Sequence, residues 1–573
     1  MAAQDMISAE NQQPTAEVVV QLTTKLKDES LHVPEEPIVV PANLGRYKLS
    51  ELVNQLLGRD KPVPFDFLVT TKKAVAPLLK ESGSNEQQAA EIQSKTDGKP
   101  AEQVFLRQTL QHLQIEYGIS SEKTLEVEYV LALPPMQTNE SEASDDWISC
   151  VRYCEKNNLC VVSSYDGSLK VFDLLDNGST SGAAEKDGEN KQEQSLQQVF
   201  SERISEAGIT SVEVIEEEQN AVKIVLADKD GVVYFGRVCV EKEQGSTKTS
   251  KNKTSSTSSS NPLSERKATF ALISRSEDVV ETSPCAYEKA VECIAVSGKK
   301  QLVATGGWDW SQGVKIWNVQ EVFEPKTNAT TSASLKRKND NGNQNENSGT
   351  ATASFAAKPE FTVQTKNLKN RVTGLVFLDE CSLLISSLDA TVCVVDLVAN
   401  TVLGSVLHTG LAVLQVDYSK EANILACAHE SGRISFWTKK VNKQGSCGAP
   451  ATANDFSFEM LENFPMNTKY HNGAISSMRF HGPHKLLSAG LDGVIRVNDP
   501  RSKTALQTIK VAEEAAAQVK KAVKPFPLKI TSVRACSSAV GDDEKGIRLL
   551  SGASDGKVRL HFPMTGNSAA DEE

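Results

Sequence analysis

The sequence predicts a mainly β protein, in which a seven-bladed β-propeller over residues 145–565 follows a smaller α+β module. Two observations carry this prediction. A strand–turn–strand signature recurs seven times between about residue 145 and the C-terminus, whereas the first 133 residues show strand and helix patterns in a non-repeating order. The recurrence indicates a repeat architecture whose units each form one blade.

The recurring signature is an Asp, usually followed by Gly, before a run in which apolar and polar residues alternate. Five regular copies occupy residues 165–172, 229–235, 388–394, 491–497 and 554–560. Two degenerate copies have a short insertion after Asp309 and a Ser431 in place of the Asp. Alternation at period two is typical of strands buried on one face, and Asp-Gly supplies the positive-φ residue of a tight hairpin. Positions 389 and 431 stand 42 residues apart, which matches the usual blade period of about 40–45 residues.

The acidic residue of each turn is predicted to be structural, because its carboxylate can accept backbone N–H groups inside the blade. We prefer this interpretation to paired catalytic carboxylates. The six residues are Asp166, Asp230, Asp309, Asp389, Asp492 and Asp555.

Polar segments interrupt the repeats and are predicted to be insertions between blades. Three have the composition of disorder, at residues 176–198, 241–267 and 324–358. A fourth, 503–526, contains strong helix formers over 510–524, and an acidic tail covers 566–573. Within the third insertion, the basic residues Lys336, Arg337 and Lys338 are a candidate for nuclear import or RNA contact. A chance basic cluster is the alternative.

The N-terminal module is predicted to span residues 17–133, between a disordered segment, 1–16, and a linker, 134–144. It contains two strands, a helix that ends at Gly58, and two more strands, at residues 17–25, 37–40, 47–57, 65–69 and 124–130. This is the order of a β-grasp, or ubiquitin-like, α+β domain. A polar segment, 71–103, interrupts the order and is predicted to be a disordered insertion.

Composition narrows the function to binding rather than catalysis. A net charge of −12 argues against a general polyanion binder, and no apolar run reaches the ~18 residues that a membrane span needs. The eleven cysteines and the polar N-terminus predict an intracellular protein with reduced thiols. Neither a phosphate loop nor a nucleophile elbow is present, and Cys150, Cys154 and Cys160 lack zinc spacing. We therefore expect no enzyme activity and no cofactor.

Four motifs resemble one family. Residues 65–68, 105–107 and 118–130, followed by Asp-Asp-Trp-Ile-Ser at 145–149, are similar to the NLE-type domain and propeller entry of the WD-repeat protein 12 family, called Ytm in fungi. The resemblance implies a seven-bladed WD-repeat propeller and a non-enzymatic assembly factor for the large (60S) ribosomal subunit, which supports maturation of its rRNA in the nucleolus and nucleoplasm. Implied partners are a pescadillo-type protein, a block-of-proliferation-type WD protein, the pre-60S particle and the AAA ATPase midasin.

The resemblance also implies a binding residue. In the family, a loop Glu completes the Mg²⁺ shell of midasin's adhesion-site domain, and the matching residue here is Glu122, so this chain alone binds no metal. A hard Mg²⁺ ion prefers oxygen ligands. Ile119, Ser121 and Arg107 are the further candidates for partner contact. The alternatives are an ordinary exposed loop acid at 122 and a surface salt bridge at Arg107.

Two other functions remain open at this point. A Notchless-like late 60S assembly factor would use the same Glu122 chemistry but carry an eight-bladed propeller. A generic propeller adaptor, such as a ubiquitin-ligase substrate receptor, would have the same fold with unrelated partners, because propellers host many functions.

Overall fold

The computed structural model describes fifteen stretches of the chain, which divide into two units, Met1–Pro134 and Pro135–Glu573. The described residues are 16–58, 62–71, 102–120, 122–141, 144–176, 194–242, 266–276, 287–324, 355–364, 368–441, 456–461, 469–502, 504–511, 528–536 and 547–563.

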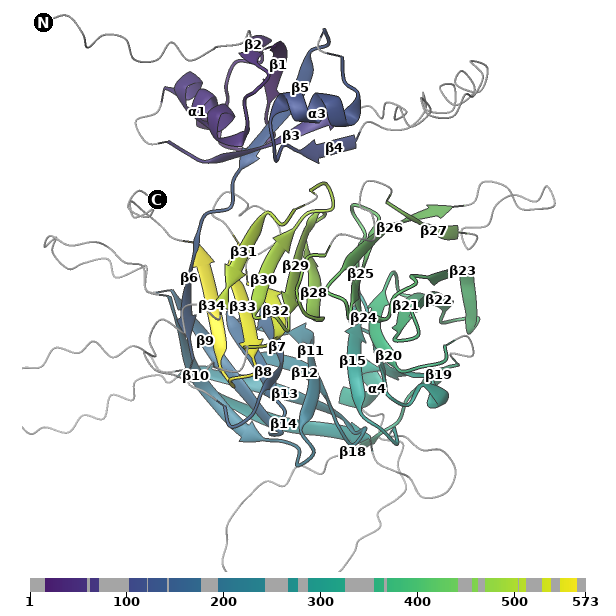
Figure 1. Cartoon of the computed structure of the whole chain (residues 1–573). Coiled ribbons are helices and arrows are strands. Elements are labelled where there is room, and N and C mark those ends of the chain that lie inside the picture. Colours follow the sequence, from purple (N-terminus) through teal and green to yellow (C-terminus); the bar gives the residue numbers. More distant parts are fainter. Residues whose placement is uncertain are drawn as a thin grey trace, which may run out of the picture. The chain divides into compact units, whose positions relative to one another are not determined.

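The first unit is an α+β module (Figure 1), as the sequence predicts. Its elements are β1 (Glu17–Thr23), the 3-10 helix η1 (Glu29–Leu31), β2 (Ile38–Pro41), α1 (Arg46–Leu57), β3 (Phe65–Thr71), β4 (Glu102–Phe105), α3 (Leu110–Tyr117) and β5 (Leu125–Leu131). The strands form one sheet in the order β2-β1-β5-β3-β4. β5 lies at its centre, parallel to β1 and antiparallel to β3, which is the β-grasp arrangement.

Alternating apolar residues of the module build a single core. Val18, Val20 and Leu22 of β1 point to the same side of the sheet and are buried with Leu49 and Val53 of α1. β4 and α3 lie in and beyond the segment that the sequence analysis assigned to an insertion. Thr109 caps α3 by accepting the His112 N–H, and Gly58 and Gly118 end α1 and α3 in the left-handed conformation.

The second unit is built from four-stranded sheets, one of which gains a fifth strand. The first three are β7 (Ile148–Cys154), β8 (Leu159–Ser164), β9 (Ser168–Asp176) and β10 (Gln194–Arg203); β11 (Ile209–Glu217), β12 (Ala221–Asp228), β13 (Val233–Lys242), β14 (Arg266–Ser276) and β18 (Phe355–Ala357); and β15 (Val291–Val296), β16 (Leu302–Gly307), β17 (Val314–Asn318) and β19 (Phe361–Val363), with η2 (Trp310–Gln312) and α4 (Val319–Phe323) beside the third.

The remaining sheets repeat the same up-and-down order. They are β20 (Val372–Phe377), β21 (Ser382–Ser387), β22 (Thr391–Asp396) and β23 (Thr401–His408); β24 (Val413–Ser419), β25 (Ile424–His429), β26 (Ile434–Val441) and β27 (Phe456–Met460); β28 (Ile475–His481), β29 (Lys485–Gly490), β30 (Val494–Asn498) and β31 (Gln507–Lys510); and β32 (Ile530–Ala535), β33 (Leu549–Ala553), β34 (Val558–Pro563) and β6 (Met136–Glu140).

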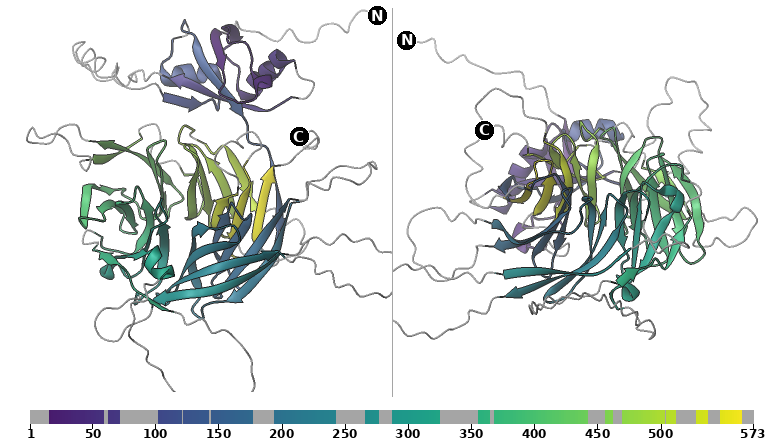
Figure 2. Two further views of the ribbon diagram at one scale, coloured as in Figure 1. Left: turned by 180° about the vertical axis from the view of Figure 1, so that it is seen from behind. Right: turned by 90° about the horizontal axis from the view of Figure 1, so that it is seen from below.

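The sheets of this unit form a closed ring (Figure 1; Figure 2). Residues in or next to the first strands of the sheets line a cavity at its centre, here called the propeller channel. The first strands of the seven sheets formed by the described residues contact one another in the order β7, β11, β15, β20, β24, β28 and β32, and β32 returns to β7. This is the arrangement of a WD-type propeller, and the prediction of a mainly β fold behind an α+β module is confirmed.

The ring is closed by a strand that the sequence analysis assigned to the linker 134–144. Met136–Glu140 forms β6, which pairs antiparallel with β34 near the other end of the chain, so the propeller begins before residue 145. The linker prediction was wrong because this strand is polar and shows no clear apolar alternation. Lys557 and Arg559 bind Glu140 at 2.5 and 2.7 Å, and Ser141 Oγ accepts the Val558 N–H.

The predicted insertions are shorter than the sequence indicated, because strands enter them from both sides. β10 begins at Gln194, β14 begins at Arg266, β18 covers Phe355–Ala357, and β31 covers Gln507–Lys510. The predicted disorder over 1–16 and the predicted helix over 510–524 lie outside the described residues except for residues 16, 510 and 511. The basic cluster at 336–338 and the acidic tail at 566–573 lie wholly outside them.

Hydrogen bonds between side chains tie the strands of several sheets together. Ser435 Oγ contacts His429 Nε2 at 2.8 Å and accepts the indole N–H of Trp437 at 3.0 Å. His471 occupies a similar place in the next sheet, between Ser488 and Asp492. Because these groups are buried, the bonds satisfy polar atoms that would otherwise destabilise the fold.

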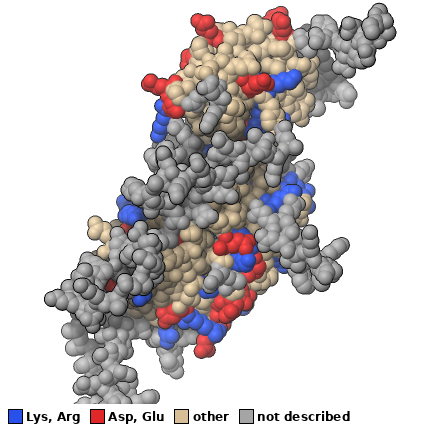
Figure 3. All heavy atoms as spheres, turned by 90° about the vertical axis from the view of Figure 1, so that its left-hand side faces the viewer, with Lys and Arg blue, Asp and Glu red and all other residues tan. Residues whose placement is uncertain are grey.

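Charged side chains of both signs share the surface. On the part of the face in Figure 3 that the described residues form, acidic and basic side chains lie among one another on the propeller unit, so no field of a single sign dominates there. No helix in the described stretches is long and apolar enough to cross a membrane.

The turn at Ala390 predicts a stabilising substitution. Ala390 has a φ of 68°, whereas the equivalent turn positions 167, 231, 432, 493 and 556 are Gly with φ of 75–86°. An L-residue is strained in this region, so Ala390→Gly should raise the free energy of unfolding by about 0.5–1 kcal/mol. Chemical denaturation measures the change. The control Ala399→Gly, at an exposed turn residue of the same sheet without positive φ, should not stabilise the protein; equal effects would refute the strain argument.

Ring closure predicts a stability loss with a defined pH dependence. Arg559 is 1% exposed and binds both Glu140 and Asp555, at 2.7 and 2.5 Å. Arg559→Met should lower the free energy of unfolding at pH 7 by about 2–3 kcal/mol, because Asp555 loses its ion-pair partner and Glu140 keeps only Lys557. The more exposed Lys557→Met should cost less.

Acid should remove the same stabilisation. Burial raises the pKa of Glu140 and of Asp555, but the basic partners outweigh burial and hold both pKa values below the ordinary range. Since a carboxyl with a depressed pKa stabilises the fold above its unfolded pKa of about 4, stability falls as the pH drops through the folded value. The free energy of unfolding, measured by chemical denaturation between pH 6 and pH 3, should fall less with decreasing pH in Arg559→Met than in wild type. An equal fall in both proteins would contradict this assignment.

Candidate functional site

The loop that carries Glu122 starts from a fixed helix end. Gly118, with a φ of 62°, ends α3, and its N–H bonds to the carbonyls of Gln114 and Ile115. The Ile119 N–H also donates to the Gln114 carbonyl at 2.9 Å, which completes a glycine-based helix cap. The chain therefore leaves the helix in one direction and reaches β5 within a few residues.

Glu122 stands exposed in a turn of this loop. Its N–H donates to Ser120 Oγ at 3.4 Å, and the Lys123 N–H donates to the Ser120 carbonyl at 3.2 Å. No hydrogen bond or ion pair from the described residues engages the Glu122 carboxylate. A carboxylate presented in this way is free to bind a cation supplied from outside the chain.

The loop leads directly into the central strand of the sheet. β5 pairs with β1 from Leu125 to Glu128 and with β3 from Val127 to Leu131, so hydrogen bonds hold it on both sides. Leu125, Val127 and Tyr129 are buried in the core. Tyr129 also donates to the Leu31 carbonyl at 2.8 Å. Glu122 is thus anchored through the most constrained strand of the module.

The other candidates for partner contact have different surroundings. Ile119 packs against the core of the module. Arg107 is half-buried over the Phe105 ring and bonds to Asp66 at 3.4 Å, beside a closer contact from Arg46 at 2.5 Å. Ser121 lies outside the described residues. These contacts match the salt-bridge alternative for Arg107 and place Ile119 in a structural position.

The acids of β5 separate into two kinds. Glu126 is exposed, whereas Glu128 accepts from Lys25 at 2.7 Å and from Gln103 at 2.8 Å. Glu122 therefore differs from Glu128 in having its carboxylate unengaged by the described residues.

Most of the acidic turn residues in the propeller accept hydrogen bonds within their turns. The donors are the backbone N–H of Ser168 to Asp166 (2.6 Å), Thr391 to Asp389 (3.0 Å), Val494 to Asp492 (3.3 Å) and Lys557 to Asp555 (3.1 Å), and the Ser311 hydroxyl and Glu288 N–H to Asp309 (2.8 and 3.3 Å).

The assignment of Asp230 was wrong. Asp230 is exposed, and the buried acceptor in this turn is Asp228, which receives the Asp230 and Val232 N–H groups at 3.0 and 2.9 Å. Asp228 also accepts the hydroxyls of Ser205 and Tyr234, both at 2.8 Å. Asp228 is the structural acid of this turn because four donors surround its carboxylate. The Asp-Gly pattern in the sequence does not reveal these donors.

The described part of the chain contains no group of three or more His, Cys, Asp or Glu side chains placed to hold a metal ion. Cys150, Cys154 and Cys160 are buried free thiols on β7 and β8. Burial raises the pKa of Cys154 and of Cys160 well above the ordinary thiol value, so both are protonated at neutral pH.

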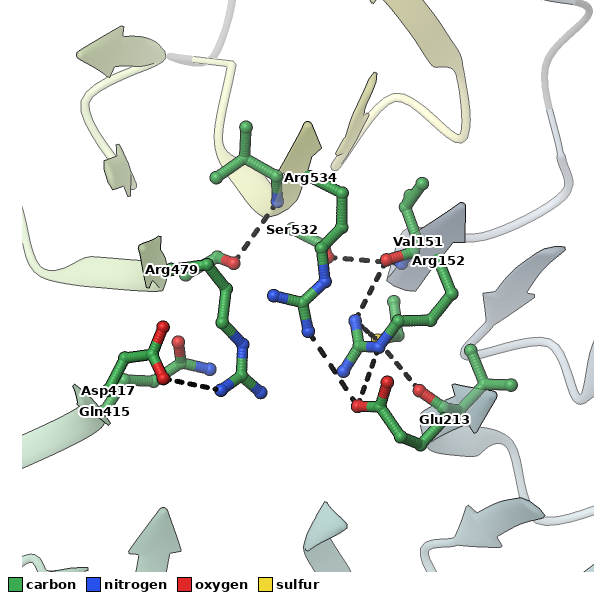
Figure 4. A network of polar contacts seen from close by, with 12 residues as sticks. Val151, Arg152, Glu213, Gln415, Asp417, Arg479, Ser532 and Arg534 are labelled. Atoms are coloured by element: carbon green, nitrogen blue, oxygen red, sulfur yellow. Dashed lines mark hydrogen bonds and ion pairs between the residues drawn. The ribbon is translucent and has the colours of Figure 1, made fainter. Parts of the chain in front are cut away.

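The sequence analysis missed a charged network inside the propeller channel (Figure 4). Glu213 binds Arg152 Nε at 2.9 Å and lies 3.8 Å from Arg534, while Arg479 lies 3.6 Å from Asp417. Burial raises the pKa of Glu213, but the charges of Arg152, Arg534 and Arg479 hold it below the ordinary range. Glu213 is therefore ionised at neutral pH.

A sequence signal for this network exists. The first strand of each sheet that carries one of these charged residues has a β-bulge near its start. The charged residue lies two positions after the first residue that follows the bulge. The tripeptides are Cys150-Val-Arg152, Ser211-Val-Glu213, Gln415-Val-Asp417, Ser477-Met-Arg479 and Ser532-Val-Arg534. Aligning the repeats on the bulge, and not only on the Asp-Gly turn, would have placed them in one layer.

Comparison with protein families explains the two units. Residues 18–80 match the NLE (NUC135) domain, and residues 136–173 and 464–499 match the WD domain, G-beta repeat. The chain carries an NLE domain and WD repeats. The first WD match begins where β6 begins, which agrees with the place of that strand in the propeller.

Similar proteins are named as ribosome biogenesis proteins. The chain is 35% identical over 160 residues to "Ribosome biogenesis protein YTM1" of Vanderwaltozyma polyspora and 33% identical over 162 residues to that of Saccharomyces cerevisiae, in each case 28% of either chain. It is 34% identical over 166 residues to "Ribosome biogenesis protein WDR12 homolog" of Chlamydomonas reinhardtii, 27% of this chain and 30% of that one. These relatives confirm the family resemblance, and each match spans less than a third of the relative's length.

The helix cap before Glu122 yields a stability prediction. Gly118→Ala should lower the free energy of unfolding of the NLE module by about 1 kcal/mol, because a side chain strains the left-handed conformation. Gly118→Asn should lose less, since Asn tolerates that conformation better. Hydrogen exchange of α3 and β5 amides in the full chain measures both. Equal protection in wild type and the Ala variant would show that the cap does not depend on Gly118.

Proposed function

We propose that this chain is a non-enzymatic ribosome biogenesis factor that acts on precursors of the large subunit in the nucleolus and nucleoplasm. In this proposal it works with a pescadillo-type protein and a block-of-proliferation-type WD protein, and midasin removes it from the particle by gripping the NLE module. The names of its relatives and the combination of an NLE domain with WD repeats support the proposal.

The observation that carries the proposed grip is the exposed Glu122 carboxylate at the entrance to β5. Mg²⁺ favours carboxylate oxygens, and a monodentate acid can fill the position that a partner's own ligands leave open. Glu122 is exposed and no group of the described residues competes for its carboxylate, so binding would break no internal contact.

The fold of the NLE module is suited to bear a pulling force applied at Glu122. Force on Glu122 enters β5, whose backbone bonds to β1 and β3 on both edges, so several hydrogen bonds would share it. A loop followed by an edge strand would transmit the same force to one neighbour only. The propeller unit then serves as the docking platform for the WD-type partner.

The test is binding of the full chain to the midasin adhesion-site domain, with Mg²⁺ and with chelator. Wild type should bind only with Mg²⁺, and Glu122→Ala should weaken binding by about 100-fold, or about 2.7 kcal/mol. Glu126→Ala, which removes an exposed acid from the following strand, is the matched control and should bind as wild type.

Binding that ignores both metal and Glu122 would overturn the grip. Purification of the tagged chain separates the broader alternatives: recovery of pre-ribosomal particles supports an assembly factor, whereas recovery of a cullin instead would favour a ubiquitin-ligase adaptor.

A further inference from the structure

The side chains at one equivalent position in the first strands of the sheets, two residues after the residue that follows the β-bulge, together form a layer in the propeller channel. In ring order from β24, five of these positions hold Asp417, Arg479, Arg534, Arg152 and Glu213, on β24, β28, β32, β7 and β11. These strands are consecutive neighbours in the ring. Three arginines therefore stand side by side, with one carboxylate at each end of the row, and the row has one uncompensated positive charge.

The three arginines are not equally satisfied. Arg152 donates to Glu213 at 2.9 Å, to Cys150 Sγ at 2.7 Å and to its neighbour's carbonyl at 2.9 Å. The side chains of Arg479 and Arg534 have only ion pairs, at 3.6 and 3.8 Å, and neither guanidinium group forms a hydrogen bond with the described residues. Their guanidinium groups point into the channel with donors unused (Figure 4).

The two carboxylates at the ends of the row do not form close ion pairs with all three arginines. Both oxygens of Asp417 accept backbone N–H groups, from Tyr418 at 3.0 Å and from Phe480 at 2.7 Å. Glu213 lies closer to Arg152, at 2.9 Å, than to Arg534, at 3.8 Å. Arg534, in the middle of the row, therefore has a like charge on each side and its acidic partner at the limit of contact.

The positive charges on both sides of Arg534 also act on its pKa. Burial lowers the pKa of Arg534, the charges of Arg152 and Arg479 lower it further, and Glu213 only partly compensates. Burial lowers the pKa of Arg152 as well, but there Cys150 and Glu213 outweigh burial and raise the pKa. An added anion at this point would therefore be attracted to Arg534 more than to Arg152.

The other polar groups beside Arg479 and Arg534 are also donors. Ser477 and Ser532 accept backbone N–H groups through Oγ, which leaves their hydroxyl protons to donate. Gln415 Oε1 accepts the Met478 N–H at 2.8 Å, which leaves its amide NH₂ group. A ligand here meets several donors, and of the two nearby carboxylates, both oxygens of Asp417 and one oxygen of Glu213 are already engaged.

Space for a ligand is present on both sides of the row. A cavity of about 870 Å³ is lined in part by Arg152, Arg479, Arg534, Gln415, Ser477 and Ser532, and elsewhere by charged residues of both signs, Asp146, Glu292, Lys229 and Arg371. A second, of about 420 Å³, is lined by Glu213, Arg479 and Arg534. Arg479 and Arg534 border both cavities, so an anion between them is reachable along the channel.

We propose that the propeller channel binds a phosphate-class oxyanion between Arg479 and Arg534. Planar guanidinium groups bind phosphate through paired N–H donors, and phosphate has enough oxygens to accept from both arginines and from the serine hydroxyls. A carboxylate has only two oxygens and one charge, which suits this donor set less well. The anion is either free phosphate or a phosphoryl group on a larger molecule that enters the channel.

Calorimetric titration of the full chain, purified without phosphate, tests the site. Inorganic phosphate and pyrophosphate are added at constant ionic strength, with acetate as the carboxylate control. Phosphate should bind, and Arg534→Gln and Arg479→Gln should each weaken it by at least about tenfold. Arg496→Gln, on the third strand of the β28 sheet and outside the cavity lining, should bind as wild type.

Thermal unfolding separates a ligand role from a structural one. In phosphate-free buffer, Arg534→Gln should melt no lower than wild type, because it removes a charge from between two like charges. In phosphate, wild type and Arg496→Gln should gain stability and Arg534→Gln should not. A large stability loss in phosphate-free buffer would show that Arg534 is a structural arginine and would overturn the proposal.

The remaining outcomes are also decisive. Binding of pyrophosphate without inorganic phosphate supports the site and identifies the ligand as part of a larger phosphorylated molecule. Acetate binding as tight as phosphate binding, or no binding of any of the three anions, overturns it. Either result would leave the proposed function intact, because none of these residues belongs to the NLE module.

Discussion

The pairing of β6 with β34 is the constraint on which the propeller depends. A ring of sheets has no edge only when its last sheet is completed, and here the completing strand comes from residues 136–140, more than 400 positions before its partner in the chain. Glu140 fixes the register because it meets both Lys557 and Arg559. This pairing adds to the direct contact between β32 and β7, which brings Arg534 and Arg152 together in the charged row.

Local patterns predicted the parts of the fold that local physics decides. Period-two alternation and Asp-Gly turns identified most propeller strands, and the helix that ends at Gly58 matches α1. β6 escaped because Met136–Glu140 has the composition of a linker and becomes a strand only through a distant partner. β4 escaped for a related reason: its four residues border a polar segment and are held by pairing with β3.

The functional residues divide along the same line. The family resemblance placed Glu122 in the loop before a predicted strand, and β5 is that strand. The helix before the loop, α3, was not predicted. The half-buried state of Arg107 depends on Asp66, which is 41 positions away, so no local pattern reveals it. Arg152 and Arg534 are further apart still, and they become neighbours only because the ring brings β32 back to β7.

The connection between the two units gives the closure strand a further consequence. β5 ends at Leu131 and β6 begins at Met136, so tension on the module passes through a few residues into the N-terminal end of β6. That end pairs with Pro563, whereas the contacts of Glu140 and Ser141 lie at the other end of the strand. A pull would therefore separate the weaker end first and meet the ion pairs of Glu140 last. In the proposed removal by pulling, those ion pairs would be the last contacts to resist the detachment of β6 from β34.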